Sequence, residues 1–253
     1  MLNTPEYYSR LYDIGLELPP VGVKFDFFRP EGYEQLSLDS AMSLCEMFAL
    51  SQKENQAFYF SDENTETCVG KVLLGMEDFQ PFAESGQIGA RLKVFNEPRA
   101  NRHFYQFVRK MDKGTVNYVT FAPASQIRFN PDVLVIAANP EKAEIIMRAV
   151  THSTGEMYES KCTPVMGCSW FLIYPFVTGK VNFIVPALVH GPSGRRLFSP
   201  DTLLIGIPYR WIPTVIENLN TMDIELAGHA GKEAYYADFE DILADLSERA
   251  KNP

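Results

Sequence analysis

Residues 130–141 have the sequence Asn-Pro-Asp-Val-Leu-Val-Ile-Ala-Ala-Asn-Pro-Glu, which joins a continuous apolar run to the start of a helix. Val133–Ala138 is a continuous apolar run, which is typical of a strand covered on both faces. Asn139, Pro140 and Glu141 then supply an N-cap, a first-turn proline and an early acid, in the order that begins a helix. The stretch therefore predicts a buried strand followed at once by a helix over Lys142–Thr151.

The same pattern returns later in the chain, where the apolar run Leu203–Ile207 precedes a predicted helix over Pro213–Met222. Amphipathic spacing and capping residues predict further helices over Asn3–Glu17, Leu38–Gln52, Cys68–Gly75 with Thr67 as its N-cap, Pro81–Gly86, Pro98–Met111 and Gly167–Val177. Further strands are predicted over Val21–Phe28, Ala57–Phe60, Val116–Phe121 and Val181–Pro186. Because strands and helices are interspersed, we expect an α/β (mixed α+β) fold. It would have a mixed β-sheet covered by helices, in one domain or two intimately packed halves.

Net charge separates the chain into a nearly neutral body and an acidic end. The 253 residues carry a formal charge of −9. Nine acids and three bases lie from residue 217 onward, which accounts for −6 of that charge. We expect a single domain over residues 1–253, ending in an acidic helical segment over residues 220–253 whose helix is Lys232–Arg249. The acidic balance argues against partners with anionic surfaces, namely nucleic acids and anionic membranes.

The start of the chain and its apolar runs favour a cytoplasmic location. Met1–Arg10 is polar and lacks the cationic segment and apolar run of a signal peptide. The longest apolar stretches, Val133–Ala138 and Trp170–Val177, are far shorter than the ~20 residues that a membrane-spanning helix needs. We therefore expect no membrane contact and a reducing compartment.

The four cysteines form no Cys-x-x-Cys pair, so a reducing compartment favours free thiols or metal ligands over disulfides. Cys68 and Cys168 are predicted to begin helices, where the helix dipole lowers a thiol pKa and favours thiolate. Cys45 lies on the core-facing stripe of its helix. Two interpretations stay open. Either these three thiols converge on one metal site, completed by Cys162 or His190, or each is a small buried apolar side chain.

The segment His190–Arg196, His-Gly-Pro-Ser-Gly-Arg-Arg, is predicted to be a flexible loop that holds a carboxylate or phosphate. The alternative is an ordinary turn with solvated arginines. A lysine in an apolar strand could serve as a base or an anion anchor, although such lysines usually reach back to solvent. The candidate ligand-binding residues are Lys24, His190, Ser193, Gly194, Arg195 and Arg196. No P-loop and no dinucleotide-binding fingerprint occurs in the sequence.

Several blocks together resemble a known family over about residues 19–219. They are Pro20-Val21-Gly22-Val23-Lys24-Phe25, Cys68-Val69-Gly70 with Leu74-Gly75-Met76, Asn130-Pro131-Asp132-Val133, Asn139-Pro140-Glu141-Lys142-Ala143, Cys168 with Pro175 and Thr178-Gly179, Gly194-Arg195-Arg196, and Ile205-Gly206-Ile207-Pro208. The family is domain of unknown function 169, found in archaea and many anaerobic bacteria, and it has no settled activity. The resemblance adds weight to a shared role for Cys45, Cys68 and Cys168.

Three functional hypotheses follow, and none of them decides whether the protein is an enzyme. The first is a redox-type protein that binds a metal or metallocofactor through Cys45, Cys68, Cys168 and Cys162: an iron–sulfur cluster, a haem-type tetrapyrrole or zinc. The second is a metal-free protein that binds a small anionic ligand through residues 190–196. The third is an accessory subunit of a redox enzyme complex, which meets its partner, or a second copy of itself, through the acidic C-terminal helix.

Overall fold

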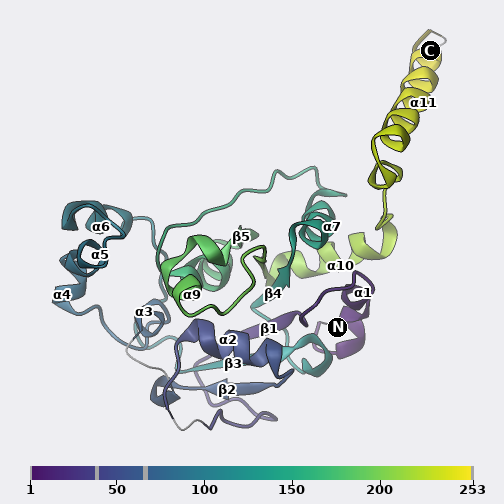
Figure 1. Cartoon of the computed structure of the whole chain (residues 1–253). Coiled ribbons are helices and arrows are strands. Elements are labelled where there is room, and N and C mark those ends of the chain that lie inside the picture. The colour runs from purple at the N-terminus through teal and green to yellow at the C-terminus, as the bar shows by residue number, and fades with distance from the viewer. Residues whose placement is uncertain (1, 38–39, 65–67, 252–253) are drawn as a thin grey trace. The chain divides into compact units, whose positions relative to one another are not determined.

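The computed structural model describes residues 2–37, 40–64 and 68–251, and its centre is a six-stranded antiparallel sheet (Figure 1). The strands are β1 (Val21–Asp26), β2 (Phe58–Phe60), β3 (Tyr118–Pro123), β4 (Val133–Ala138), β5 (Asn182–Ile184) and β6 (Leu203–Pro208). Their order in the sheet is β2-β3-β1-β4-β6-β5, and every pair of neighbours is antiparallel. The mixed α+β class expected from the sequence is confirmed.

Strand β4 has the predicted bounds, and each of its residues is buried. Alternate side chains of a strand point to opposite faces. Val133 and Val135 join the core cluster on one face, whereas Leu134 and Ile136 are equally buried outside that cluster. In this antiparallel sheet, the strand β4 is therefore covered on both faces. That explains why polar and apolar residues do not alternate along β4.

One face of the sheet carries α2 (Leu44–Lys53) and the helix that spans residues 167–178. Their aromatic rings meet directly, since the Phe48 and Phe171 centroids are 5.3 Å apart. Helix α2 begins at Leu44, with Ser43 as its N-cap, and not at the predicted Leu38, which lies outside the described residues. The reason is a capping box, in which Ser43 and Glu46 satisfy each other's backbone N–H groups.

The strand β4 also contacts α7 (Pro140–Thr151), which has Asn139 as its N-cap as predicted. The Asn139 side chain accepts a hydrogen bond from the N–H of Lys142 at 2.9 Å. Helix α10 (Ile212–Thr221) is tied to α7, because the buried Asn218 amide donates to the carbonyl of Ala149 at 2.8 Å. Helix α7 contacts both β4 and β6, and both helices contribute buried apolar side chains, such as Ile146 and Val215.

A π-helix, Ser169–Ile173, interrupts the helix over residues 167–178 before its α-helical end, α8 (Tyr174–Thr178). Pro175 has no N–H to donate to the carbonyl of Phe171. That carbonyl instead lies against β6, where a Cβ on Gly206 would be only 2.2 Å from it. The buried Asn182 amide donates to the carbonyl of Trp170 at 2.8 Å. The widened turn is therefore held by a glycine and an asparagine far away in the sequence.

The remaining elements of the body are short. Its other α-helices are α1 (Ser9–Tyr12), α3 (Val69–Leu73), α4 (Pro81–Glu84), α5 (Gln87–Arg91), α6 (Pro98–Phe104) and α9 (His190–Gly194). Its 3-10 helices are Pro5–Tyr8, Asp62–Asn64, Ala124–Gln126, Pro186–Leu188 and Tyr209–Trp211. The predicted first helix, Asn3–Glu17, is thus shorter and partly 3-10 in form. Helices α4, α5 and α6 lie together at the left of Figure 1, with α3 beside them.

The chain divides into two compact units, residues 1–220 and residues 221–253. The first contains the sheet and the helices already described. The second contains a 3-10 helix, Ala227–Ala230, and the 20-residue helix α11 (Lys232–Lys251). Within the described part of the chain, no helix is both long enough and apolar enough to span a membrane.

Candidate functional site

Three of the four cysteines come together, although they belong to three segments that are distant in the sequence. Cys45 is on α2, Cys68 precedes α3, and Cys168 lies at the start of the helix over residues 167–178. The thiol of Cys168 lies next to that of Cys45, and it is also within electrostatic range of Cys68. The structure therefore brings these three thiols near one another, but the described residues show no arrangement of them that could hold a metal ion.

The pKa of Cys168 moves in the opposite direction from the sequence prediction. The hydrogen bond to Cys45, burial, and the nearby Cys45 and Cys68 groups all raise it well above its usual value. Cys168 is buried, and Cys45 is also buried. Helix-start position alone predicted a thiolate at Cys168, whereas the neighbouring Cys45 thiol and burial both favour the neutral form of Cys168. Cys168 is thus a neutral thiol that lies buried beside Cys45.

Cys68 faces a pocket, and a glycine determines its position. The thiol accepts a hydrogen bond from the N–H of Gly70 at 3.2 Å and so caps α3. The predicted N-cap, Thr67, lies outside the described residues. A Cβ on Gly70 would be 2.9 Å from the Cβ of Leu44 and 3.2 Å from the sulfur of Cys68. Only glycine lets α3 pack this closely on α2 while the thiol closes the helix end.

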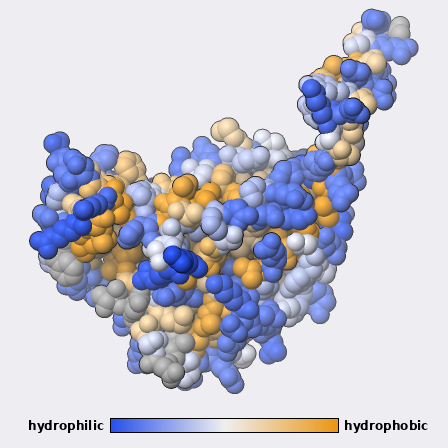
Figure 2. All heavy atoms as spheres, viewed as in Figure 1, coloured by the Kyte–Doolittle hydropathy of each residue, from blue (hydrophilic) through white to orange (hydrophobic). Residues whose placement is uncertain are grey.

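The pocket beside Cys68 has a volume of about 300 Å³ and lies among α3, α4–α6 and the start of α9. Its described lining residues are Cys68, Val69, Val72, Glu77, Asp78, Phe79, Gln80, Ala83, Ile88, Gly89, Leu92, Asn101, Tyr105, Val165, Met166, His190 and Gly191. Figure 2 shows apolar side chains gathered where α4–α6 face the rest of this unit. The walls are thus mainly apolar, with a few polar groups among them.

Three of the lining residues carry donors for soft or borderline metals: the thiol of Cys68, the thioether of Met166 and the imidazole of His190. Contacts of the backbone fix the positions of Met166 and His190. The N–H of His190 donates to the carbonyl of Pro164 at 2.8 Å. A Cβ on Gly167 would be 3.2 Å from the ring of Pro192, so glycine allows residues 164–167 to pack against α9.

The charge of the pocket is unsuited to an anion. Glu77 and Asp78 contribute carboxylates, and the described lining contains no lysine or arginine. Asp78 is paired with Lys113, which is not itself a lining residue. A neutral or cationic ligand with a large apolar surface therefore matches this pocket better than a carboxylate or phosphate does.

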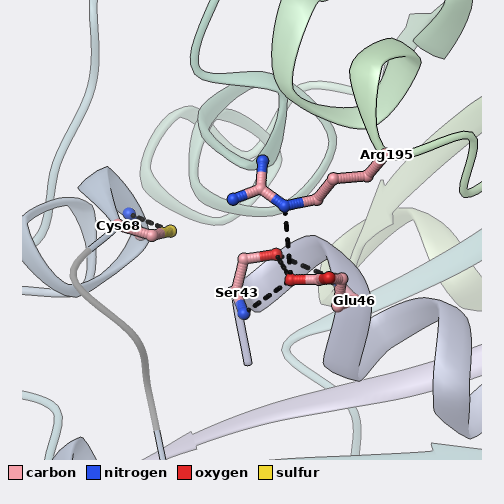
Figure 3. Close-up of polar contacts among 5 residues, drawn as sticks. Ser43, Glu46, Cys68 and Arg195 are labelled. Atoms are coloured by element: carbon pink, nitrogen blue, oxygen red, sulfur yellow. Dashed lines mark hydrogen bonds and ion pairs between the residues drawn. The ribbon is translucent and has the colours of Figure 1, made fainter. Parts of the chain in front are cut away.

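Residues 190–196 are not the open loop predicted from the two glycines, because His190–Gly194 forms the helix α9. The Nε of Arg195 is 3.3 Å from Oε2 of Glu46, and Figure 3 shows this pair beside Ser43 in one view with Cys68. Ser193 and Arg196 instead line a separate, smaller pocket of about 260 Å³. The candidate anion-binding groups are consequently divided among different surroundings.

Burial by itself would raise the pKa of Glu46, but other interactions outweigh it. The hydroxyl and N–H of Ser43 both donate to Glu46 Oε2, at 2.5 and 3.0 Å, and Arg195 adds a positive charge. The pKa of Glu46 is therefore held below its usual value. The ionised form of Glu46 is therefore favoured at the start of α2. Its ion pair with Arg195 links the end of α9 to α2.

The two other predicted site residues lie away from the pocket. Cys162 is exposed, with its sulfur 3.5 Å from the carbonyl of Thr163, and the structure does not bring it to the other thiols. Lys24 pairs with Asp132 on the sheet at 3.0 Å, and Asp132 also accepts from the N–H of Phe25 at 2.8 Å. Lys24 is therefore part of a structural contact between β1 and the start of β4.

The sequence does not predict that α4–α6 form one wall of the pocket beside Cys68. Asn101 is buried, and its amide donates to the carbonyl of Gly86 at 2.9 Å. Gly86 has φ +78, a conformation that favours glycine. These residues fix the far side of the pocket, but their sequence signal is only that of short, proline-started helices.

Among the described residues, no group of three or more His, Cys, Asp or Glu side chains is arranged to hold a metal ion.

The fold and the pocket define a mixed α+β protein with a mainly apolar pocket edged by sulfur and imidazole groups. The DUF169 family model, described as uncharacterised ArCR, matches residues 12–218 of the 253. The chain belongs to this family. No curated protein and no solved structure matches it. The matched segment ends close to the boundary between the two compact units.

Proposed function

We propose that the protein binds a compact metallocofactor, an apolar organic body carrying a soft metal, in the pocket beside Cys68. The observation that carries the proposal is that a thiol, a thioether and an imidazole line one mainly apolar pocket. Sulfur and imidazole groups are preferred ligands of soft and borderline metals. Apolar walls suit an organic body, because most of the surface of a bound small molecule is desolvated.

In this proposal Cys68 is the primary ligand, with His190 and Met166 as further donors. Cys45 and Cys168 are buried and are not among the described lining residues of the pocket, whereas Cys68 is one of them. The proposal therefore keeps Cys68 alone from the cysteine set of the first hypothesis. A compact cofactor is favoured over a multi-cysteine cluster.

The test is anaerobic purification of the full chain, followed by metal analysis, an absorption spectrum and titration with Cu⁺ and Zn²⁺ as probes. We expect about one metal per chain, and we expect Cys68→Ser to weaken binding at least about tenfold. Serine can still cap α3, so this variant keeps the helix start. Cys162→Ser is the matched control, because it removes an exposed thiol outside the pocket. Equal binding by wild type and Cys68→Ser would contradict the proposal.

A second candidate, a metal-free neutral ligand, is favoured by the extent of the apolar walls. Its probe is the neutral fluorescent dye Nile red. Dye binding that is lost in Leu92→Lys but unchanged in Cys68→Ser, together with no bound metal, would favour this candidate over the metallocofactor. Leu92 lines the pocket and is 51% exposed, so its replacement leaves the core intact.

A further inference from the structure

Helix α11 carries an apolar stripe whose side chains stay about half exposed. The stripe consists of Tyr235, Tyr236, Phe239, Ile242, Leu243 and Leu246. The positions 235, 239, 242 and 246 are spaced by four, three and four residues, so they lie on one side of an α-helix. Each stripe side chain is between 47% and 56% exposed, and the helix has no buried residue.

Among the described residues of its unit, the element packed on α11 is the short segment Ala227–Ala230. The rings of Tyr235 and Phe239 are stacked, with centroids 6.2 Å apart and planes inclined by 5°. A single helix of this length is marginally stable in water, because most helical stability in proteins comes from packing of an apolar face. The unit therefore needs an additional surface to bury the stripe.

Carboxylates lie along both edges of the stripe. Glu233 and Glu240, seven residues apart, follow one edge, whereas Asp238 and Asp245 follow the other. The helix has six acids and three bases, which gives −3 over Lys232–Lys251. In a parallel pair of identical helices these edges would face each other and repel, because the carboxylates outnumber the bases and Arg249 already pairs with Asp245 at 3.0 Å. An anionic membrane would repel them as well.

We propose that α11 docks into an apolar groove bordered by lysine and arginine on a different protein. The groove would receive the aromatic rings and leucines of the stripe, and its basic borders would pair with the carboxylates at the two edges. Tyrosine and phenylalanine are enriched at the centres of protein interfaces, which agrees with three aromatic residues among six. This inference is independent of the pocket beside Cys68 and goes beyond ligand binding.

The test places a photo-crosslinking amino acid at Ser247 of the full chain, expressed in the organism that makes the protein. Ser247 borders the stripe without belonging to it. Mass spectrometry then identifies the crosslinked residue. We expect one partner protein, with the crosslink on a surface that has apolar and basic residues. Raising the salt from about 0.1 M to about 1 M before irradiation should lower the yield, because the Debye length falls from about 10 Å to about 3 Å.

Two variants separate the stripe from general effects of charge. Leu243→Glu should lower the crosslink yield at least about tenfold. Ala237→Glu adds the same charge on the opposite side of the helix, and its yield should stay within about twofold of the wild type. Reversing both edges with Asp238→Lys and Glu240→Lys should also lower the yield, although it keeps all six stripe side chains.

Four kinds of crosslink would overturn the proposal. They are a crosslink to a second copy of this chain, a crosslink to residues 1–220 of the same chain, a crosslink to lipid, and a crosslink to a partner surface without basic residues. A yield that is equal in Leu243→Glu and Ala237→Glu would do the same, as would the absence of any crosslink.

Discussion

At the scale of single residues, polar partners decide which side chains are ionised. Burial raises the pKa of both Glu46 and Cys168, but only Glu46 has donors that reverse the effect. Ser43 supplies an N–H and a hydroxyl, and Arg195 supplies a charge, so the carboxylate is favoured. Cys168 has a second thiol as its partner, which does not stabilise a negative charge, so the neutral form is favoured.

The lowered pKa of Glu46 predicts how stability depends on pH. A carboxyl whose pKa is lower in the folded state stabilises that state above its unfolded pKa, and this contribution disappears as the pH falls through the folded value. We therefore expect urea denaturation at a series of pH values to show that Glu46→Gln loses more stability at pH 7 than at pH 3. Glu54→Gln, at the other end of α2, is the control. A difference between wild type and Glu46→Gln that is the same at both pH values would contradict the assignment.

At the scale of elements, local sequence patterns explain β4 and α7 fully but explain other elements only in part. Apolar continuity and the Asn139–Pro140 start are properties of adjacent residues, so both elements could be predicted from the sequence. The π-helix at Ser169–Ile173 could not, because the groups that hold it come from β5 and β6. The pocket was missed for the same reason, since Cys68, Asn101 and His190 meet only in three dimensions.

The dependence of the π-helix on Asn182 can be tested by mutation. The Asn182 side chain donates to the carbonyls of Trp170 and Lys161 and accepts from the N–H of Lys161, at 2.8 to 3.0 Å. Asn182→Ala leaves the buried Trp170 carbonyl without this donor, so we expect a loss of about 2 kcal/mol in the free energy of unfolding. Asn130→Ala, at an exposed site, should change it by less than about 0.5 kcal/mol. Equal effects in urea denaturation would show that the amide does not hold the helix.

At the scale of the whole molecule, the boundary at residue 220 agrees with the family match, which ends at residue 218. All six strands and the pocket beside Cys68 belong to residues 1–220. The acidic end noted in the sequence is therefore mostly a separate compact unit, and its charge is not a property of the pocket. Charge counting distinguished the acidic end over residues 220–253 within an expected single domain, but it gave no information about the apolar stripe on α11.

The two-unit division predicts that residues 1–220 fold without the rest of the chain. We expect a protein truncated after Asn220 to unfold in one cooperative transition. Its Tm should lie within about 4 °C of the full chain, which corresponds to about 1 kcal/mol for a domain of this size. Calorimetry of both proteins measures this difference. An aggregated fragment, or one that melts without a cooperative transition, would show instead that residues 221–253 are needed for the fold.

The position of β1 between β3 and β4 has a consequence for biosynthesis. Val21 pairs with Pro123 on one side and with Val135 on the other, so both partners are made about 100 residues later. The sheet is complete only after β6 has left the ribosome, because β5 pairs with β6 alone. Contacts between residues so far apart make folding slow. The first strand therefore stays unpaired and exposed to aggregation through much of translation, when chaperone protection matters most.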